Sequence, residues 1–190
     1  MSATTYNFTT VTVPAGATSH KGTSGSGSLP APPSGTEGTQ ANIDNIESSN
    51  AVYWSNSPGG TPWKMFRWYD PTTDAITKYT AGAQGYGEWA WWDEENQEWE
   101  YAYNYTLDIY NFHTSAWEQL ANHVNASETT ITGSKSSNLS YYRDANSYVY
   151  TATVGYGGPA YGSSTLYDDY LYLTVEYTAG GIFVPRITLC

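Results

Sequence analysis

Cysteine is nearly absent from this chain of 190 residues, because the only thiol belongs to the last residue, Cys190. No disulfide can close within the chain, so packing and hydrogen bonds have to hold the fold together. A disulfide between two chains through Cys190 stays open as an alternative. Long apolar runs and the charged and apolar segments of an export signal are also missing, so we expect neither a cleaved signal nor membrane insertion.

Positively charged residues are also few. Lys and Arg number 7 against 18 Asp and Glu, which gives a net charge of -11. A surface with this balance repels a phosphate backbone, so we expect no nucleic-acid partner.

Aromatic residues are abundant instead. They make up 16% of the chain, with 19 Tyr and 8 Trp, while charged residues reach only 13%. Aromatic side chains favour strands, and a chain of this length suits one domain plus a tail. The composition therefore predicts an all-β fold.

The N-terminal part divides into two kinds of sequence. Residues 4–13 alternate apolar and polar side chains with one slip of phase, which predicts a strand with a bulge. Residues 14–40 are rich in Gly, Ser, Thr and Pro and poor in apolar surface. We expect residues 1–40 to form a strand and a flexible arm that docks on a neighbouring subunit, or else a long surface loop of one sandwich. Residues 41–190 would form the β-sandwich itself.

Strand patterns recur beyond residue 40 between turn-rich segments, which is typical of a sandwich or barrel. The clearest alternation covers residues 98–110, where odd positions are apolar and are expected to face the core. Further strands are expected at 148–154 and 166–177. Residues 63–69 are apolar on both faces, which predicts a central strand whose far side is covered, in one variant by a neighbouring chain. Residues 116–124 could form a short helix or a hairpin turn.

Three segments carry a resemblance to a known family. They are a strand and Asn-aromatic turn followed by a Trp strand (107–120), a Thr-rich strand (129–134) and a Leu-Tyr-Asp-Asp-Tyr strand (166–173). In this order they resemble the galactose-binding-like jelly rolls found as carbohydrate-binding modules and in tailed-virus appendage and archaeal surface proteins. The resemblance implies an antiparallel jelly-roll sandwich, glycan recognition and a structural calcium ion near the last strand.

Asp168 and Asp169 are the candidate ligands for that calcium ion. Adjacent strand residues point to opposite faces, so one of the two carboxylates should lie inward among Tyr and Leu side chains. A buried carboxylate needs a cation or hydrogen-bond donors. Calcium is what the resemblance implies, and a Tyr hydroxyl or the Arg143 guanidinium is the alternative partner.

Catalysis finds little support in the sequence. The acidic run 93–100 beside three tryptophans has the residue types of a glycosidase pair, but a hairpin with a polar turn explains it more simply. His20, His113 and His123 show no metal-ligand spacing and no pairing with a nucleophile. We therefore predict no catalytic residues and no cofactor other than the structural calcium.

Tryptophans outnumber what one small core needs. Sugars stack on such rings through their C–H faces, and Trp and Tyr are equally enriched at protein interfaces. We select five as the candidate glycan or interface residues: Trp89, Trp91, Trp92, Trp99 and Trp117.

Two functions follow from these observations. The first is a non-enzymatic structural protein of a virion, in the head, neck or tail, associating with itself or other virion proteins through the sandwich and the arm. The alternative is an extracellular glycan-binding module or adhesin that uses exposed Trp and Tyr.

Overall fold

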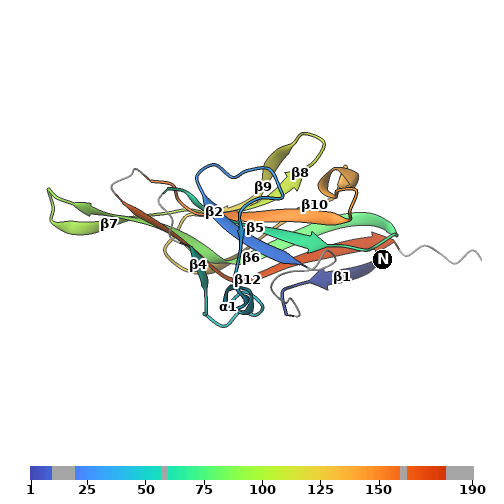
Figure 1. Ribbon diagram of the computed structural model, residues 1–190, viewed down its shortest axis with the longest axis horizontal. Helices are drawn as coiled ribbons and strands as arrows, with labels where there is room; N and C mark the ends of the chain where they lie inside the picture. Colours follow the sequence, from blue (N-terminus) through green and yellow to red (C-terminus); the bar gives the residue numbers. More distant parts are fainter. Residues whose placement is uncertain (10–19, 57–59, 159–161, 179–190) are drawn as a thin grey trace, which may run out of the picture.

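Two antiparallel sheets pack face to face and confirm the predicted all-β sandwich (Figure 1). The computed structural model describes residues 1–9, 20–56, 60–158 and 162–178. Sheet I has the order β1-β12-β6-β10, with β4 also paired to β12 and β7 to β6. Sheet II has the order β3-β2-β5-β11-β8-β9.

The described strands have the following bounds. Sheet I contains β1 (Ser2–Tyr6), β4 (Trp54–Asn56), β6 (Ala75–Asp93), β7 (Glu98–Tyr103), β10 (Thr129–Lys135) and β12 (Ser163–Thr178). Sheet II contains β2 (Lys21–Ser26), β3 (Thr36–Glu37), β5 (Pro62–Tyr69), β8 (Tyr105–Asn111), β9 (Ala116–His123) and β11 (Tyr148–Val154).

Two short helical elements occur among the described residues. The helix α1 (Gln40–Asp44) begins with a capping box, in which the Thr39 hydroxyl accepts from the Asn42 amide and the Asn42 side chain accepts from the Thr39 amide. The second is a single 3-10 turn, η1 (Leu139–Tyr142). In the part of the chain that is described, neither helix is long and apolar enough to cross a membrane.

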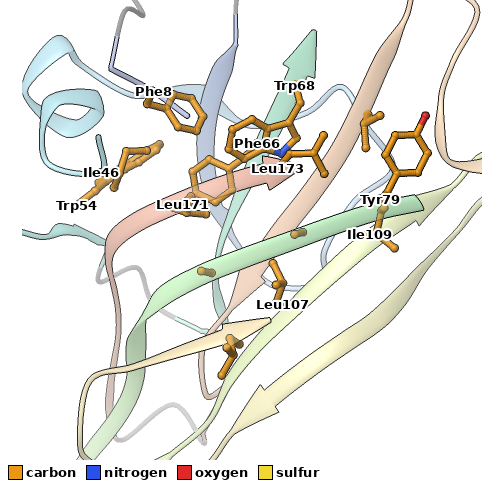
Figure 2. Packing of buried hydrophobic residues seen from close by; sticks show 14 of the residues in the cluster. Phe8, Ile46, Trp54, Phe66, Trp68, Tyr79, Leu107, Ile109, Leu171 and Leu173 are labelled. Atoms are coloured by element: carbon orange, nitrogen blue, oxygen red, sulfur yellow. The ribbon is translucent and has the colours of Figure 1, made fainter. Parts of the chain in front are cut away.

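The main core lies between the two sheets (Figure 2). Sheet I contributes alternate residues such as Leu171 and Leu173, and sheet II contributes Phe66, Trp68 and Leu107, all fully buried. Alternation along each strand places these side chains on one face, as expected for two packed sheets.

A second apolar layer covers the outer face of sheet II. Trp63, Met65, Tyr110 and Tyr150 are buried there and pack with Leu29. The indole of Trp117 donates a hydrogen bond to the Pro30 carbonyl at 2.8 Å. The prediction of a central strand over residues 63–69 is confirmed, and the chain itself provides at least part of the cover over its far side.

The predicted flexible arm is corrected in its second half. Residues 21–26 are β2, which pairs with β5 in sheet II, and α1 starts at the end of the expected arm. Small residues are required here because an added Cβ at Gly22 would lie 2.7 Å from the Trp54 ring, and one at Gly25 would collide with Trp63. The small residues in this segment therefore allow close packing under tryptophans. From composition alone, the same residues predict a flexible arm.

The first strand also differs from its prediction. β1 covers residues 2–6 and pairs with β12 of the same chain, from Ser2 opposite Tyr177 to Tyr6 opposite Leu173. Phe8 follows it into the core. Residues 10–13, the end of the predicted strand, lie outside the described residues.

The alternating segment 98–110 is two strands. Asn104 separates β7, in sheet I, from β8, in sheet II. Tyr105, Leu107 and Ile109 are buried as predicted, whereas Trp99 and Tyr101 are exposed. The alternation continues through Asn104, but the strand changes sheets there, so only its second half faces the core.

Two further strands settle sequence ambiguities. Residues 116–123 are β9, an edge strand paired with β8, so the helix or turn expected there is wrong. The predicted strands at 148–154 and 166–177 are confirmed as β11 and β12.

Candidate functional site: an aromatic face on sheet I

β6 continues beyond the sandwich and forms a projecting hairpin with β7, visible at the end of the molecule opposite the N-terminus (Figure 1). The turn follows Asp93, whose carboxylate accepts the backbone N–H groups of Glu95 and Asn96 and the Asn96 amide. These hydrogen bonds, led by the one from the Asn96 side chain, lower the pKa of Asp93. The hairpin predicted for the acidic run is confirmed, and Asp93 has a turn-forming role.

One side of the hairpin carries aromatic rings that are open to solvent. Cross-strand pairs share a face, and Trp92 pairs with Trp99, Ala90 with Tyr101 and Glu88 with Tyr103. Trp92 is 46% exposed, Trp99 56% and Tyr101 48%. Trp92 and Trp99 meet edge to face at 5.8 Å between ring centroids. These are large apolar side chains held on a paired backbone and left uncovered.

The row of rings continues along the outer side of sheet I. Tyr86 on β6 stacks on Tyr167 of β12 at 4.5 Å with an interplanar angle of 16°. Tyr53 meets both rings edge-on, at 6.1 Å and 5.7 Å. Even positions of this part of β6 face outward, because Ala81 and Ala83 belong to the core. We define the aromatic face as Tyr53, Tyr86, Trp92, Trp99, Tyr101, Tyr103 and Tyr167.

Hydrogen-bonding groups border this aromatic face. The Glu128 carboxylate accepts the Tyr53 hydroxyl at 2.8 Å and the Gln84 amide at 2.8 Å. The hydrogen bond to Glu128 is the main cause that raises the pKa of Tyr53 to about 12, and burial raises that of Tyr86 to about 12. Both phenols therefore stay neutral at physiological pH, and the single hydroxyl hydrogen of Tyr53 is held by Glu128. The face thus combines flat apolar surfaces with fixed polar groups.

Only two of the five nominated tryptophans lie on this face. Trp89 and Trp91 are at odd positions of β6 and point to the opposite side, where their rings stack at 4.1 Å. Trp89 also stacks on Tyr156 at 5.7 Å and is only 5% exposed. Trp117 lies on the outer side of sheet II, edge-on to Tyr110 at 5.1 Å. The structure therefore divides the nominated tryptophans among three surfaces.

Sequence reasoning missed the tyrosines of the aromatic face. Tyr86, Tyr101, Tyr103 and Tyr167 belong to three strands, and Tyr53 precedes a fourth. Tyr86 and Trp92 are separated by an even number of positions, so they share a face if residues 75–93 form one continuous strand. The pairing of Tyr86 with Tyr167 depends on the register between distant strands, which the sequence does not display.

Asp168 faces inward, as expected for one of the two aspartates. Its carboxylate accepts hydrogen bonds from Nζ of Lys64 at 2.7 Å, the Tyr105 hydroxyl at 2.6 Å and the Thr153 hydroxyl at 3.1 Å. The alternative of a Tyr hydroxyl is thus realised, together with a lysine that the sequence analysis did not consider. The Nζ atom of Lys64 lies 2.7 Å from Oδ2, where a calcium ion bound to this carboxylate would lie, so the Asp168 surroundings do not fit calcium.

Asp169 is buried as well, although adjacent strand residues normally alternate. The pairing of β12 with β6 shifts between Asp168 and Tyr170, which marks a bulge at Asp169. Its carboxylate accepts the Asn50 backbone N–H at 3.2 Å. Within the described ranges, no three His, Cys, Asp or Glu side chains lie close enough together to hold a metal ion.

Comparisons with known proteins give structural likeness only. No family model matches the chain, and no curated protein matches it. A solved structure of TmCBM61 in complex with β-1,4-galactotriose has a TM-score of 0.35 at 11% identity, covering 90% of this chain and 86% of that one. The K3 cleaved adhesin domain of Lys-gingipain from Porphyromonas gingivalis w83 has a TM-score of 0.33 at 13% identity, with 76% and 80% covered. Similarity at this level transfers no ligand to this chain.

Proposed function

We propose that this chain is a non-enzymatic glycan-binding module of an extracellular or surface protein, and that the aromatic face is its binding surface. The observation that carries the proposal is the row of rings that runs from the stacked, partly exposed Tyr167 and Tyr86 to the solvent-open Trp92 and Trp99. Pyranose rings present apolar C–H faces that stack on such side chains, and neighbouring polar groups hydrogen-bond their hydroxyls.

The form of the surface favours an extended oligosaccharide. The rings lie along β6 and β7, so successive platforms follow the strand direction at roughly 6.6 Å for every second residue. An open row offers several rings to consecutive sugars, whereas a single terminal sugar would need a concave pocket. The hairpin backbone is hydrogen-bonded, so little ordering entropy is lost when a ligand binds.

Charge narrows the class of glycan. The net charge of -11 and the Glu128 carboxylate at the border of the face disfavour sulfated or uronic polymers. Neutral polysaccharides are the expected ligands. The predicted role in a virion has no support from these observations and stays a prediction.

The test is a screen of neutral and acidic oligosaccharides followed by titration calorimetry. Trp99→Ala and Tyr101→Ala should each weaken binding of a neutral glycan by about tenfold or more, which corresponds to about 1.4 kcal/mol. Tyr141→Ala is the matched control, because Tyr141 is a partly exposed tyrosine that stacks on His113 outside the aromatic face. Equal affinity of all three variants, or absence of binding to every neutral glycan, contradicts the proposal.

A further inference from the structure

Lys64 and Asp168 form a contact between the two sheets that is independent of the aromatic face. Lys64 belongs to β5 of sheet II and Asp168 to β12 of sheet I, and they are 104 positions apart in the chain. Both side chains are 0% exposed, and Nζ lies 2.7 Å from Oδ2. An amine and a carboxyl group are therefore held in contact where water is excluded.

Burial disfavours the charged form of the Lys64 amine. Desolvation lowers the pKa of Lys64, and the nearby Asp168 carboxylate opposes this change. Transfer of the proton from Nζ to Oδ2 across the existing hydrogen bond produces a neutral amine and a neutral carboxylic acid, which avoids two buried charges.

The surroundings orient the neutral amine for attack. Besides Asp168, Nζ contacts two acceptors, the carbonyl oxygens of Trp54 and of Leu166, the latter at 3.0 Å. A neutral amine has two hydrogens, and these two carbonyls accept both. The remaining direction at nitrogen is the lone pair, which then faces Oδ2 of Asp168, an atom bonded to the carboxyl carbon and 2.7 Å from Nζ.

The carboxyl group is activated from its other side. The Tyr105 hydroxyl donates to Oδ1 at 2.6 Å, so it can stabilise negative charge that develops on that oxygen. The Thr153 hydroxyl donates to Oδ2 at 3.1 Å, the oxygen that carries the transferred proton. Oδ1 is thus the oxygen that stays on the carboxyl carbon, and Oδ2 is the oxygen that leaves.

We propose that Lys64 and Asp168 condense to an amide, an isopeptide bond that links the two sheets covalently. The Nζ–Cγ bond forms and the Cγ–Oδ2 bond breaks. Oδ2 leaves as water with the proton it received and one hydrogen of the amine, and no oxidant or co-reactant is needed. The amide nitrogen keeps one hydrogen for a carbonyl acceptor, and the amide oxygen keeps its hydrogen bond from Tyr105.

The intact mass of the purified full chain under denaturing conditions tests this proposal directly. The linked chain should be lighter than its sequence by the mass of one water molecule. Trypsin digestion should release a joined fragment that contains uncleaved Lys64 and Asp168. A wild-type chain with its full sequence mass, and with cleavage after Lys64, overturns the proposal and leaves a buried ion pair.

Two sets of variants establish which groups take part. Lys64→Arg replaces the primary amine with a guanidinium, which cannot form this amide, and Asp168→Ala removes the carboxyl group, so each should show its full sequence mass. Tyr105→Phe should lower the linked fraction measured at a fixed time after synthesis. A water loss that persists in Lys64→Arg overturns the assignment, because the dehydration then lies elsewhere. The wild-type mass decides the outcome even if a variant fails to fold.

Discussion

The Tyr69 backbone N–H donates a hydrogen bond to Nδ1 of His20 at 3.1 Å, which connects the residue before β2 to the last residue of β5. The His20 ring also packs edge-on against Tyr6 at 5.3 Å and lies 5.5 Å from the ring of Trp68. Nδ1 can accept this hydrogen bond only when it carries no proton. The contact therefore makes part of the stability of the fold depend on pH.

We expect thermal stability to fall as the pH drops from about 6.5 toward 4. Burial, and then the Arg67 charge, lower the pKa of His20 from 6.5 to about 4 in the folded chain. The unfolded chain thus takes up this proton first, so stability from His20 is complete above pH 6.5 and lost on acidification. The difference in melting temperature between the wild type and His20→Asn should shrink over this interval. A constant difference from pH 7.5 to 4 would show that His20 does not titrate as described.

Gly22→Ala should destabilise the fold by about 1–3 kcal/mol, because the added methyl group meets a ring that cannot move away. The Trp54 ring is 3% exposed and packs in the main core, and Ile43 lies on the same side at 3.2 Å. Urea unfolding measures the effect. Ser26→Ala is the control at an exposed position of the same strand. Equal midpoints for both variants would mean that β2 does not pack under Trp54.

Trp89→Ala and Trp99→Ala should differ greatly in their effect on the free energy of unfolding, although both residues lie in the β6–β7 hairpin. Trp89 is nearly buried between Trp91 and Tyr156, so its removal should cost about 3–5 kcal/mol. Trp99 is 56% exposed, so its removal should change stability by only about 0.5 kcal/mol. Denaturant unfolding followed by far-UV circular dichroism separates the two. A large loss of stability in Trp99→Ala would assign it a packing role.

Deletion of residues 1–6 should increase the solution mass of the chain, measured by light scattering. β1 covers the edge of β12 from Leu173 to Tyr177, and its loss leaves that edge free to pair with another chain. Adding Thr174→Lys to the shortened chain should lower the mass again, because a charge on the edge discourages pairing. Arm exchange between subunits, as expected from the sequence, requires the reverse, a smaller mass after deletion.

The sequence carried the fold class but not the division of strands between sheets. Alternation located the core positions of β8, because burial on one face leaves a period of two in the residues. The same alternation runs through Asn104, where the chain passes from sheet I to sheet II, and nothing local marks that passage. Gly22 and Gly25 show a second limit, since their reason for being small lies in tryptophans from other strands.

The candidate site was located only in part for a related reason. Trp92 and Trp99, two of the nominated glycan or interface residues, are exposed. Trp89 and Trp91 are at odd positions of β6 and therefore point to the other face of the strand from Trp92. Whether odd or even positions of β6 face outward is known only once the face of β6 that meets the core is known. Lys64 was hidden more completely, because its partner Asp168 is 104 positions away and only the packing of the sheets brings them together.

The length of β6 gives the hairpin a mechanical property. The strand has 19 residues, which corresponds to about 60 Å of continuous backbone from its first residue in the sandwich to its last residue at the hairpin turn. A pull on the tip, directed along the strand, loads the many β6–β12 hydrogen bonds side by side in shear, so they must break together. Force applied to the hairpin along the strand is therefore transmitted through the β6 backbone to the centre of sheet I.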